Sequence, residues 1–213
     1  MKEELDIVYE DNHLLVVNKP PGMLVQGDVT GDLSLVDYAK SYIKRKYDKP
    51  GNVYIGLPHR IDRPTSGIVV LAKTSKALSR LNKQFSSRVT EKSYWAIVKK
   101  PIANDSAELK HYLKKNQKKN KSFAYNKAVP EAKKAILNYK QIAELKNYIG
   151  LSINLATGRH HQIRCQLATI GNPIKGDLKY GFPRSNPDGS IHLHARAISL
   201  AHPVKIEKMS FQA

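Results

Sequence analysis

Cysteine is nearly absent from this sequence, whose 213 residues include only one, Cys165. A single cysteine excludes an intrachain disulfide and a zinc site built from several cysteines. Long apolar runs are missing too, because stretches such as residues 68–72 fall far short of the ~20 residues that span a bilayer. Residues 1–6 carry no signal-peptide pattern. These absences predict a protein of a reducing, cytoplasmic compartment that has no membrane partner.

Acidic residues are scarce, since 18 Asp and Glu stand against 36 Lys and Arg and leave a net charge of +18. A surplus of this size attracts polyanions and makes their binding salt-dependent, which indicates a nucleic-acid partner. Attraction to an anionic membrane surface is the alternative. It would call for an amphipathic basic helix with an apolar face, and the sequence contains none.

The periodicity of apolar residues predicts a mixture of strands and helices. In residues 33–46 apolar side chains recur at helical spacing, and Thr74 or Ser75 can cap a second helix. A third helix is expected from Thr157-Gly158 to Ala168, which would place His160 and Arg164 one turn apart on the same face. Strands are expected at residues 7–9, 14–17, 68–72, 92–99, 134–143 and 148–155.

These elements do not alternate regularly between strand and helix, as they would in a parallel sheet. The predicted fold class is therefore α+β, with a mixed, largely antiparallel sheet and flanking helices. The sequence shows no internal repeat and no linker, so we expect one domain over residues 1–213 that acts as a monomer. Residues 110–121 contain six lysines and little that is apolar, which predicts a solvated hairpin or loop.

The segment 56–67, GLPHRIDRPTSG, holds two prolines and two glycines and is predicted to be a loop before an apolar strand. Functional groups are commonly presented in this way. Asp62 lies between Arg60 and Arg63, which would favour the ionised carboxylate that a nucleophile requires. From these residues alone a structural salt bridge explains the pattern as well, because ion-pair networks gather the same side chains.

The sequence resembles the RNA pseudouridine synthases of the RluA family over nearly its whole length. Order and spacing both match, and the aspartate-containing motif is more specific than a lone Arg-x-Asp. Many relatives carry an N-terminal S4-like RNA-binding module, whereas this chain is expected to enter the catalytic domain within its first ten residues. The resemblance is carried by LLVVNKPPGMLV (14–25), HRIDRPTSGIVVLAKT (59–74), EKSYWAIV (91–98), ATGRHHQIRCQLATIGNPIKGDLKYG (156–181) and LHARAISLAHPV (193–204).

The resemblance implies an isomerase that flips a uridine of rRNA or tRNA out of its helix and converts it to pseudouridine without a cofactor or a metal. The family's catalytic aspartate falls on Asp62, its active-site tyrosine on Tyr94, and the arginine that pairs with the catalytic carboxylate on Arg164. The residue that fills the space of the extruded base falls on Arg60. The residues expected to bind substrate are His59, Arg60, Thr65, His161 and Ile163.

Other functions fit the sequence less well. A non-catalytic RNA-binding protein would explain the charge, but phosphate binding does not demand Asp62, Tyr94 and Arg164 together. The zinc signature of base deaminases and the G-x-G-x-x-G of dinucleotide enzymes are both absent. His192 and His194 could share a strand face, yet no cysteine or histidine cluster completes a metal site. Cys165 is expected to be a small buried residue and not a nucleophile.

Overall fold

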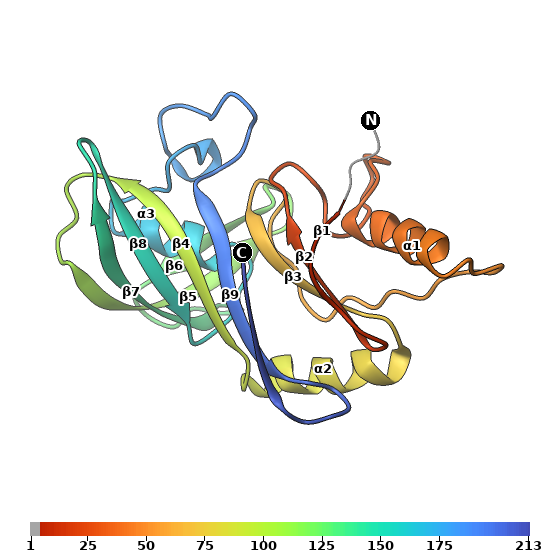
Figure 1. The fold of residues 1–213 in the computed structure, drawn as a ribbon. Coiled ribbons are helices and arrows are strands. Elements are labelled where there is room, and N and C mark those ends of the chain that lie inside the picture. The colour runs from red at the N-terminus through yellow and green to blue at the C-terminus, as the bar shows by residue number, and fades with distance from the viewer. Residues whose placement is uncertain (1–4) are drawn as a thin grey trace. The chain divides into compact units, whose positions relative to one another are not determined.

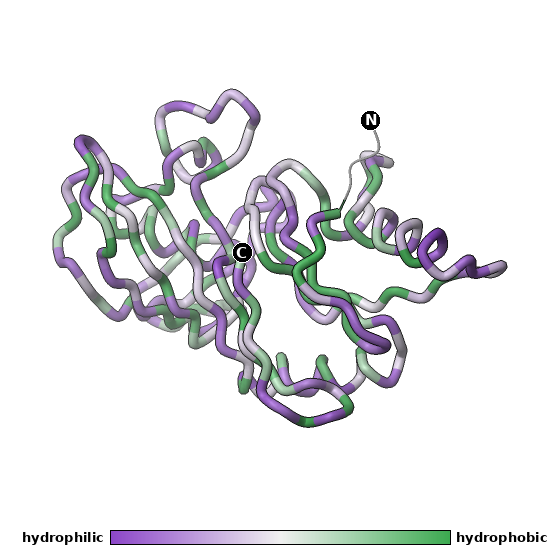
Figure 2. The backbone as a smooth tube through the Cα atoms, viewed as in Figure 1, coloured by the Kyte–Doolittle hydropathy of each residue, from purple (hydrophilic) through white to green (hydrophobic). Residues whose placement is uncertain are grey.

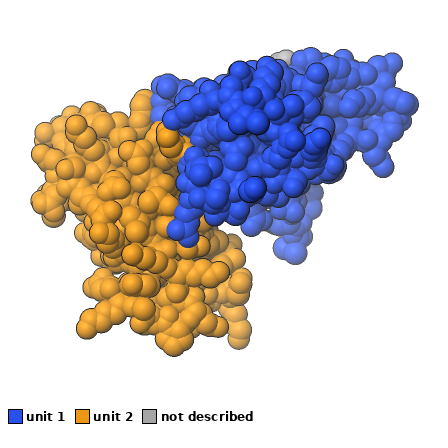
Figure 3. Space-filling model, turned by 90° about the horizontal axis from the view of Figure 1, so that it is seen from below, with its two compact units in different colours: residues 1–90, 195–213 blue, residues 91–194 orange. Residues whose placement is uncertain are grey.

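The computed structural model describes residues 5–213. In this part of the chain there are ten strands, three α-helices and one short 3-10 helix. They form two compact units, coloured separately in Figure 3: unit 1 is Met1–Thr90 with Ala195–Ala213, and unit 2 is Glu91–His194. That residues 1–213 act as one catalytic domain stays a prediction.

The sheet of unit 1 has β2 and β3 at its centre (Figure 1). These two strands pair antiparallel, with Leu14 opposite Ala72 and Val17 opposite Val69. Nearly every residue in them is buried, and residues 14–17 and 68–72 are continuous apolar runs without alternation. β1 pairs with β2, β9 lies next to β3, and β10 pairs with β9. The strands are β1 (Asp6–Glu10), β2 (Leu14–Lys19), β3 (Ser66–Ala72), β9 (Leu193–Ala201, which belongs to unit 1 from Ala195 onward) and β10 (Lys208–Gln212).

Both helices of unit 1 begin at caps that the sequence encodes. Ser34 and Asp37 form a reciprocal capping box at the start of α1 (Leu35–Lys46). The Thr74 side chain accepts the Ala77 N–H at the start of α2 (Ser75–Ser87). Ala77 and Leu81 of α2 are buried in one cluster with apolar residues of β2 and β3.

In unit 2 five antiparallel strands follow the order β4-β8-β7-β5-β6. Buried and more exposed positions alternate along much of β5 and β7. In Figure 2 hydrophobic and hydrophilic colours are interspersed along the chain. One face buries its side chains in a core that includes residues of α3. The elements are β4 (Glu91–Lys99), β5 (Ser106–Asn116), β6 (Lys121–Tyr125), β7 (Lys133–Glu144), β8 (Tyr148–Leu155), α3 (Gln162–Thr169) and the 3-10 helix η1 (Leu178–Tyr180).

This architecture confirms the predicted α+β class with a largely antiparallel arrangement of strands. The lysine-rich segment 110–121 is a hairpin, as expected, and consists of the end of β5, a turn and the start of β6. Every helix between residues 5 and 213 is too short or too polar to cross a membrane.

The third helix was predicted to start too early. α3 begins at Gln162, and His161 before it has a φ of 51°, in the left-handed region. The Gln162 side chain accepts the Arg159 N–H and donates to the Ile136 carbonyl, which holds the preceding residues in a turn. His160 therefore lies outside the helix and does not share a helical face with Arg164.

Candidate active site

Asp62 lies in an irregular loop that precedes β3 in unit 1, as the sequence predicted. The loop starts where Gly56 pairs with Ala72 through two backbone hydrogen bonds of 2.8 and 2.9 Å. It ends in a turn in which the Thr65 N–H donates to the Asp62 carbonyl at 3.0 Å. Asp62 itself is half-buried. The loop is thus hydrogen-bonded to the sheet at its start and closed by a turn where it continues into β3, which limits the positions that the carboxylate can reach.

Lys19, at the end of β2, also anchors this loop. The sequence did not identify it as a functional residue. Its side chain is completely buried, and Nζ donates to the carbonyls of Pro20 (2.7 Å), Met23 (2.9 Å) and Arg63 (3.2 Å). Burial lowers the pKa of Lys19 to about 8, against the opposing effect of the Asp62 charge. The available signal was a lysine that ends a fully apolar strand directly before Pro20-Pro21.

Gly67, the last residue of the Thr-Ser-Gly motif, must be glycine in this fold. Its φ is 112°, and a Cβ atom there would lie less than 3.0 Å from three backbone atoms of Ala195. The close approach of β3 and β9 fixes the strand that carries the loop.

The other expected residues of unit 1 have distinct surroundings. His59 Nε2 accepts the Val70 N–H at 2.9 Å, and the imidazole stacks on Phe85 with ring centroids 4.8 Å apart. Arg60 is exposed, and its guanidinium lies 3.4 Å from the Gln26 side-chain oxygen. Thr65 is 1% exposed, and its hydroxyl makes no hydrogen bond within residues 5–213.

Arg63, the other arginine next to Asp62 in the sequence, points to different partners. Its Nη2 donates to the Asp32 carboxylate at 2.8 Å and its Nε to the Gly22 carbonyl at 2.9 Å. Arg63 therefore ties the loop to the preceding segment, in addition to any electrostatic effect on Asp62.

In unit 2, Arg164 forms a buried two-pronged ion pair with Asp177. Arg164 Nε donates to Oδ2 at 2.7 Å and Nη2 donates to Oδ1 at 2.8 Å. The two side chains are 5% and 1% exposed. Asp177 was not singled out from the sequence, although it belongs to the GDLKYG segment. The guanidinium is thereby held in a fixed orientation.

Tyr180 joins Arg164 to His161. The Arg164 guanidinium lies 5.1 Å from the centre of the Tyr180 ring. Burial raises the pKa of the Tyr180 phenol well above its ordinary value, so it stays protonated at neutral pH. The phenol oxygen accepts the Ser122 N–H at 2.9 Å, and it lies 3.0 Å from His161 Nδ1. Because the phenol is protonated, it can donate to that nitrogen, which leaves Nε2 of His161 as the donor when the ring is neutral.

Tyr94 and Ile163 lie on the same core of unit 2. Tyr94 is on β4 opposite Ile153 of β8 and packs, partly buried, against the cluster that contains Ile163. Ile163 is 4% exposed. Unit 1 thus brings Asp62, His59, Arg60 and Thr65 into one loop. Unit 2 contains the other four expected residues, which are Tyr94, His161, Ile163 and Arg164.

Cys165 is a buried core residue, as predicted. It is 3% exposed, its sulfur lies 3.3 Å from the Ser122 carbonyl, and burial raises the pKa of the thiol to about 11. A thiol with this pKa is not nucleophilic at neutral pH. Within residues 5–213, no group of three or more His, Cys, Asp or Glu side chains is arranged to hold a metal ion.

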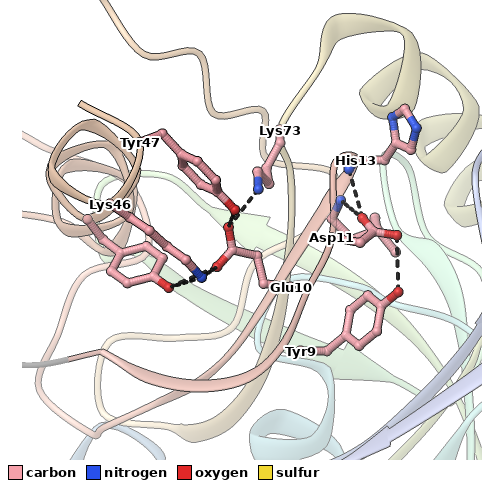
Figure 4. Close-up of polar contacts among 9 residues, drawn as sticks. Tyr9, Glu10, Asp11, His13, Lys46, Tyr47 and Lys73 are labelled. Atoms are coloured by element: carbon pink, nitrogen blue, oxygen red, sulfur yellow. Dashed lines mark hydrogen bonds and ion pairs between the residues drawn. The ribbon is translucent and has the colours of Figure 1, made fainter. Parts of the chain in front are cut away.

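A second polar cluster contains none of the expected residues and is formed by the end of β1, by α1 with its C-cap Tyr47, and by Lys73 (Figure 4). The Glu10 carboxylate accepts from Lys73 (2.6 Å), Lys46 (2.7 Å), Tyr42 (2.8 Å) and Tyr47 (2.8 Å). Burial opposes ionisation of Glu10, but these hydrogen bonds outweigh it and lower its pKa to about 2. We call these five residues the Glu10 cluster.

Known proteins resemble this chain in sequence and in fold. Residues 13–169 match the model of the RNA pseudouridylate synthase family. The dual-specificity RNA pseudouridine synthase RluA of Haemophilus influenzae is 33% identical over 98% of this chain and 92% of its own length. The ribosomal large subunit pseudouridine synthase D of Zymomonas mobilis is 32% identical over 98% of this chain and 68% of its own length. The solved structure of human RNA pseudouridylate synthase domain containing 4 has the same fold, with a TM-score of 0.79 at 23% identity, covering 97% of this chain and 87% of that one.

Proposed function

Because the chain belongs to the RNA pseudouridylate synthase family and is a pseudouridine synthase, we propose that it isomerises a specific uridine of rRNA or tRNA, with Asp62 as the group that acts on the ribose. The observation that carries this proposal is the position of Asp62: the family match includes its loop, and that loop is bonded to β3 at Gly56, closed by the turn at Thr65 and bonded to Lys19 at the end of β2. We further propose that the protein works as a monomer in the cytoplasm.

The reaction breaks the bond from uracil N1 to ribose C1′, rotates the base and joins its C5 to C1′. The proton that leaves C5 is balanced by one that N1 gains, so substrate and product have the same atoms and the same oxidation state. The balance requires no oxidant, reductant or water. A hydrolase of glycosidic bonds usually needs a second carboxylate, whereas retention and reattachment of the base need one group at the sugar.

Asp62 would act in one of two ways. Its carboxylate forms a bond with C1′ as the base departs, or it removes a neighbouring ribose proton and so starts the departure. In both cases the oxygen must be held within reach of the sugar. The contacts of Lys19 and Arg63 with the surrounding backbone support this role, because they restrict the positions that the loop can adopt.

The target uridine must leave the helical stack before Asp62 can reach its sugar. Flipping costs least in a loop or bulge of the RNA, where the base is already unpaired. Arg60 is exposed and long enough to occupy the vacated space. Tyr94 would stack on the flipped uracil and take part in proton removal from C5, with Ile163 as an apolar contact of the base.

Arg164 would supply a positive charge beside the reacting carboxylate. Its fixed bidentate pair with Asp177 and its contact with the Tyr180 ring pre-orient the guanidinium, so little conformational entropy remains to be lost when RNA binds. His161, which is held by the same phenol, would present Nε2–H to the substrate.

The test replaces Asp62 with Asn, which keeps the size and removes the charge that makes the oxygen nucleophilic or basic. We expect pseudouridine formation in RNA from cells that lack the protein to fall below detection, while circular dichroism and RNA affinity in filter retention stay as in the wild type. Asp32→Asn is the matched control, because Asp32 is a carboxylate of the same unit that binds Arg63.

The rival to this proposal is a protein that binds RNA and does no chemistry. Wild type that modifies no host RNA would favour this rival. Folded Asp62→Asn that modifies RNA at an undiminished rate would show that another residue is catalytic.

A further inference from the structure

The sheet of unit 2 has a face that α3 does not cover. Along β5, Leu109, His111 and Leu113 are buried, and Leu113 packs with Cys165 of α3. Because neighbouring side chains on a strand point to opposite faces, the intervening residues lie on the other side of the sheet. These residues are Lys110, Tyr112 and Lys114.

The strand register extends this outer face over β6 and β7. Tyr112 lies opposite Tyr125 of β6 and opposite Lys134 of β7, and Lys114 lies opposite Phe123. Residues directly opposite each other share a face, with Cβ atoms ~4.5–5.5 Å apart. We call this surface the lysine–aromatic face; it consists of Lys110, Tyr112, Lys114, Phe123, Tyr125 and Lys134.

The aromatic rings on this face are exposed to an extent that packing does not explain. Phe123 and Tyr125 are each 39% exposed on β6, in a sheet whose opposite face buries Leu113 of β5 and Ala135 of β7. A solvated strand face normally carries polar residues. Rings interleaved with lysines combine a stacking surface with a positive charge.

The charge on this face fits an anionic partner. Its two acidic neighbours are surface groups: Glu108 pairs with Lys110, and Glu131, whose side chain is 77% exposed, pairs with Lys114 at 2.7 Å. Such exposed ion pairs contribute little to stability, so a phosphate group can replace the carboxylate beside each lysine. Proteins that bind single-stranded nucleic acid combine these two elements, a positive surface along the backbone and aromatic side chains under the bases.

We propose that the lysine–aromatic face binds unpaired nucleotides of the RNA substrate, with Tyr112, Phe123 and Tyr125 stacking on bases and Lys110, Lys114 and Lys134 contacting phosphates. This inference deepens the proposed function by adding a second contact with the same RNA. Stacking is tolerant of sequence because every base has a π face. The face therefore adds affinity for single-stranded segments and leaves the choice of uridine to other residues.

The experiment uses oligo(A), which contains no uridine and cannot be a substrate for isomerisation, with one 2-aminopurine as a fluorescent reporter of stacking. Tyr125→Leu is compared with Tyr54→Leu, a tyrosine of unit 1 that is 45% exposed. We expect Tyr125→Leu to weaken binding at least ~5-fold and Phe123→Leu/Tyr125→Leu to weaken it further, since stacking on one ring is worth ~5-fold or more in Kd. Tyr54→Leu should bind like the wild type.

Two further readouts separate stacking from charge and from catalysis. The aromatic variants should reduce quenching of 2-aminopurine while the salt dependence of binding stays unchanged, because no phosphate contact is removed. The same losses are expected in an Asp62→Asn background, so a failed catalytic assignment would leave this result intact. Wild-type affinity in folded Phe123→Leu/Tyr125→Leu, or an equal loss in Tyr54→Leu, would overturn the proposal.

Discussion

The Glu10 cluster of unit 1 and the Arg164 cluster of unit 2 are built from similar parts. In each, a buried charge is held by oppositely charged and phenolic groups: Glu10 by two lysines and two tyrosines, and Arg164 by Asp177 and the Tyr180 ring. They differ in what surrounds them. The Glu10 carboxylate is enclosed by its own partners, whereas Arg164 adjoins Ile163 and shares Tyr180 with His161. A buried ion pair is thus weak evidence for function until its neighbours are considered.

Removing one phenolic oxygen from each unit tests the difference between the two units most directly. Tyr94→Phe removes a hydroxyl proposed to assist proton transfer, and we expect turnover to fall ~10²- to 10⁴-fold with near-normal RNA binding. Tyr42→Phe removes a hydroxyl that donates to Glu10, and it should cost about 1 kcal/mol of unfolding free energy with unchanged turnover. Single-turnover kinetics and urea unfolding measure the two effects. Equal turnover in Tyr94→Phe and the wild type would leave Tyr94 a stacking role only.

Replacing each carboxylate by its amide tests whether both pairs are merely structural. Asp177→Asn leaves the Arg164 charge buried without its counter-ion, which should destabilise the protein by about 3–5 kcal/mol and lower turnover of the folded fraction. Glu10→Gln should also destabilise the protein, because Lys46 and Lys73 lose their partner. Its turnover per folded molecule should match the wild type. If both variants retain full turnover, the distinction between the two clusters is lost.

The contribution of the Glu10 cluster to the unfolding free energy should depend on pH in the acid range. The folded-state pKa of Glu10 is about 2, below its ordinary value of 4.5, so its contribution to stability is complete above the unfolded pKa. That contribution is lost as pH falls from about 5 to about 2, and it amounts to roughly 3 kcal/mol. Glu10→Gln should flatten the pH dependence of the unfolding free energy in this window. A profile parallel to that of the wild type would contradict the assignment.

The smallest expected effect concerns surface charge. Replacing Lys114, Lys115, Lys118 and Lys119 by Gln should weaken RNA binding and reduce its salt dependence by up to ~0.7–0.9 log unit of slope per lost phosphate contact. Turnover of saturated enzyme should persist. The matched control changes four exposed lysines of unit 1, which are Lys40, Lys44, Lys76 and Lys83. Equal slopes in the two quadruple variants would mean that the hairpin has no special role in RNA binding.

Strongly periodic segments could be predicted from the sequence because their signal is local. The apolar run of β2, the amphipathic α1 and the capped α2 all lie within a few residues of their predicted bounds. β6 was not predicted, because a segment that starts with Lys121 and has one buried position offers little periodicity. β9 was not predicted as a strand either.

In the site, too, only the features with a local sequence signal could be predicted. The loop around Asp62 was predicted from its composition, and the resemblance supplied its proposed role. Lys19 and Asp177 were missed because their importance lies in contacts with residues 44 and 13 positions away. No local pattern encodes which carbonyl or guanidinium a side chain will reach after folding. The wrong start of α3 has a related cause, since the Gln162 side chain bonds to Ile136, 26 positions away.

Unit 1 consists of residues 1–90 and 195–213, so its two segments leave the ribosome at different times during synthesis. Unit 2 is continuous from Glu91 to His194 and can fold as soon as it has emerged. The loop of Asp62 is translated much earlier, but β3 obtains its neighbour at Gly67 only when β9 has been made. A nascent chain that stops before Ala195 therefore contains Asp62 on an unfinished sheet. Residues 195–213, which are translated after the Asp62 loop and after unit 2, complete the support of the residue that is proposed to act on the ribose.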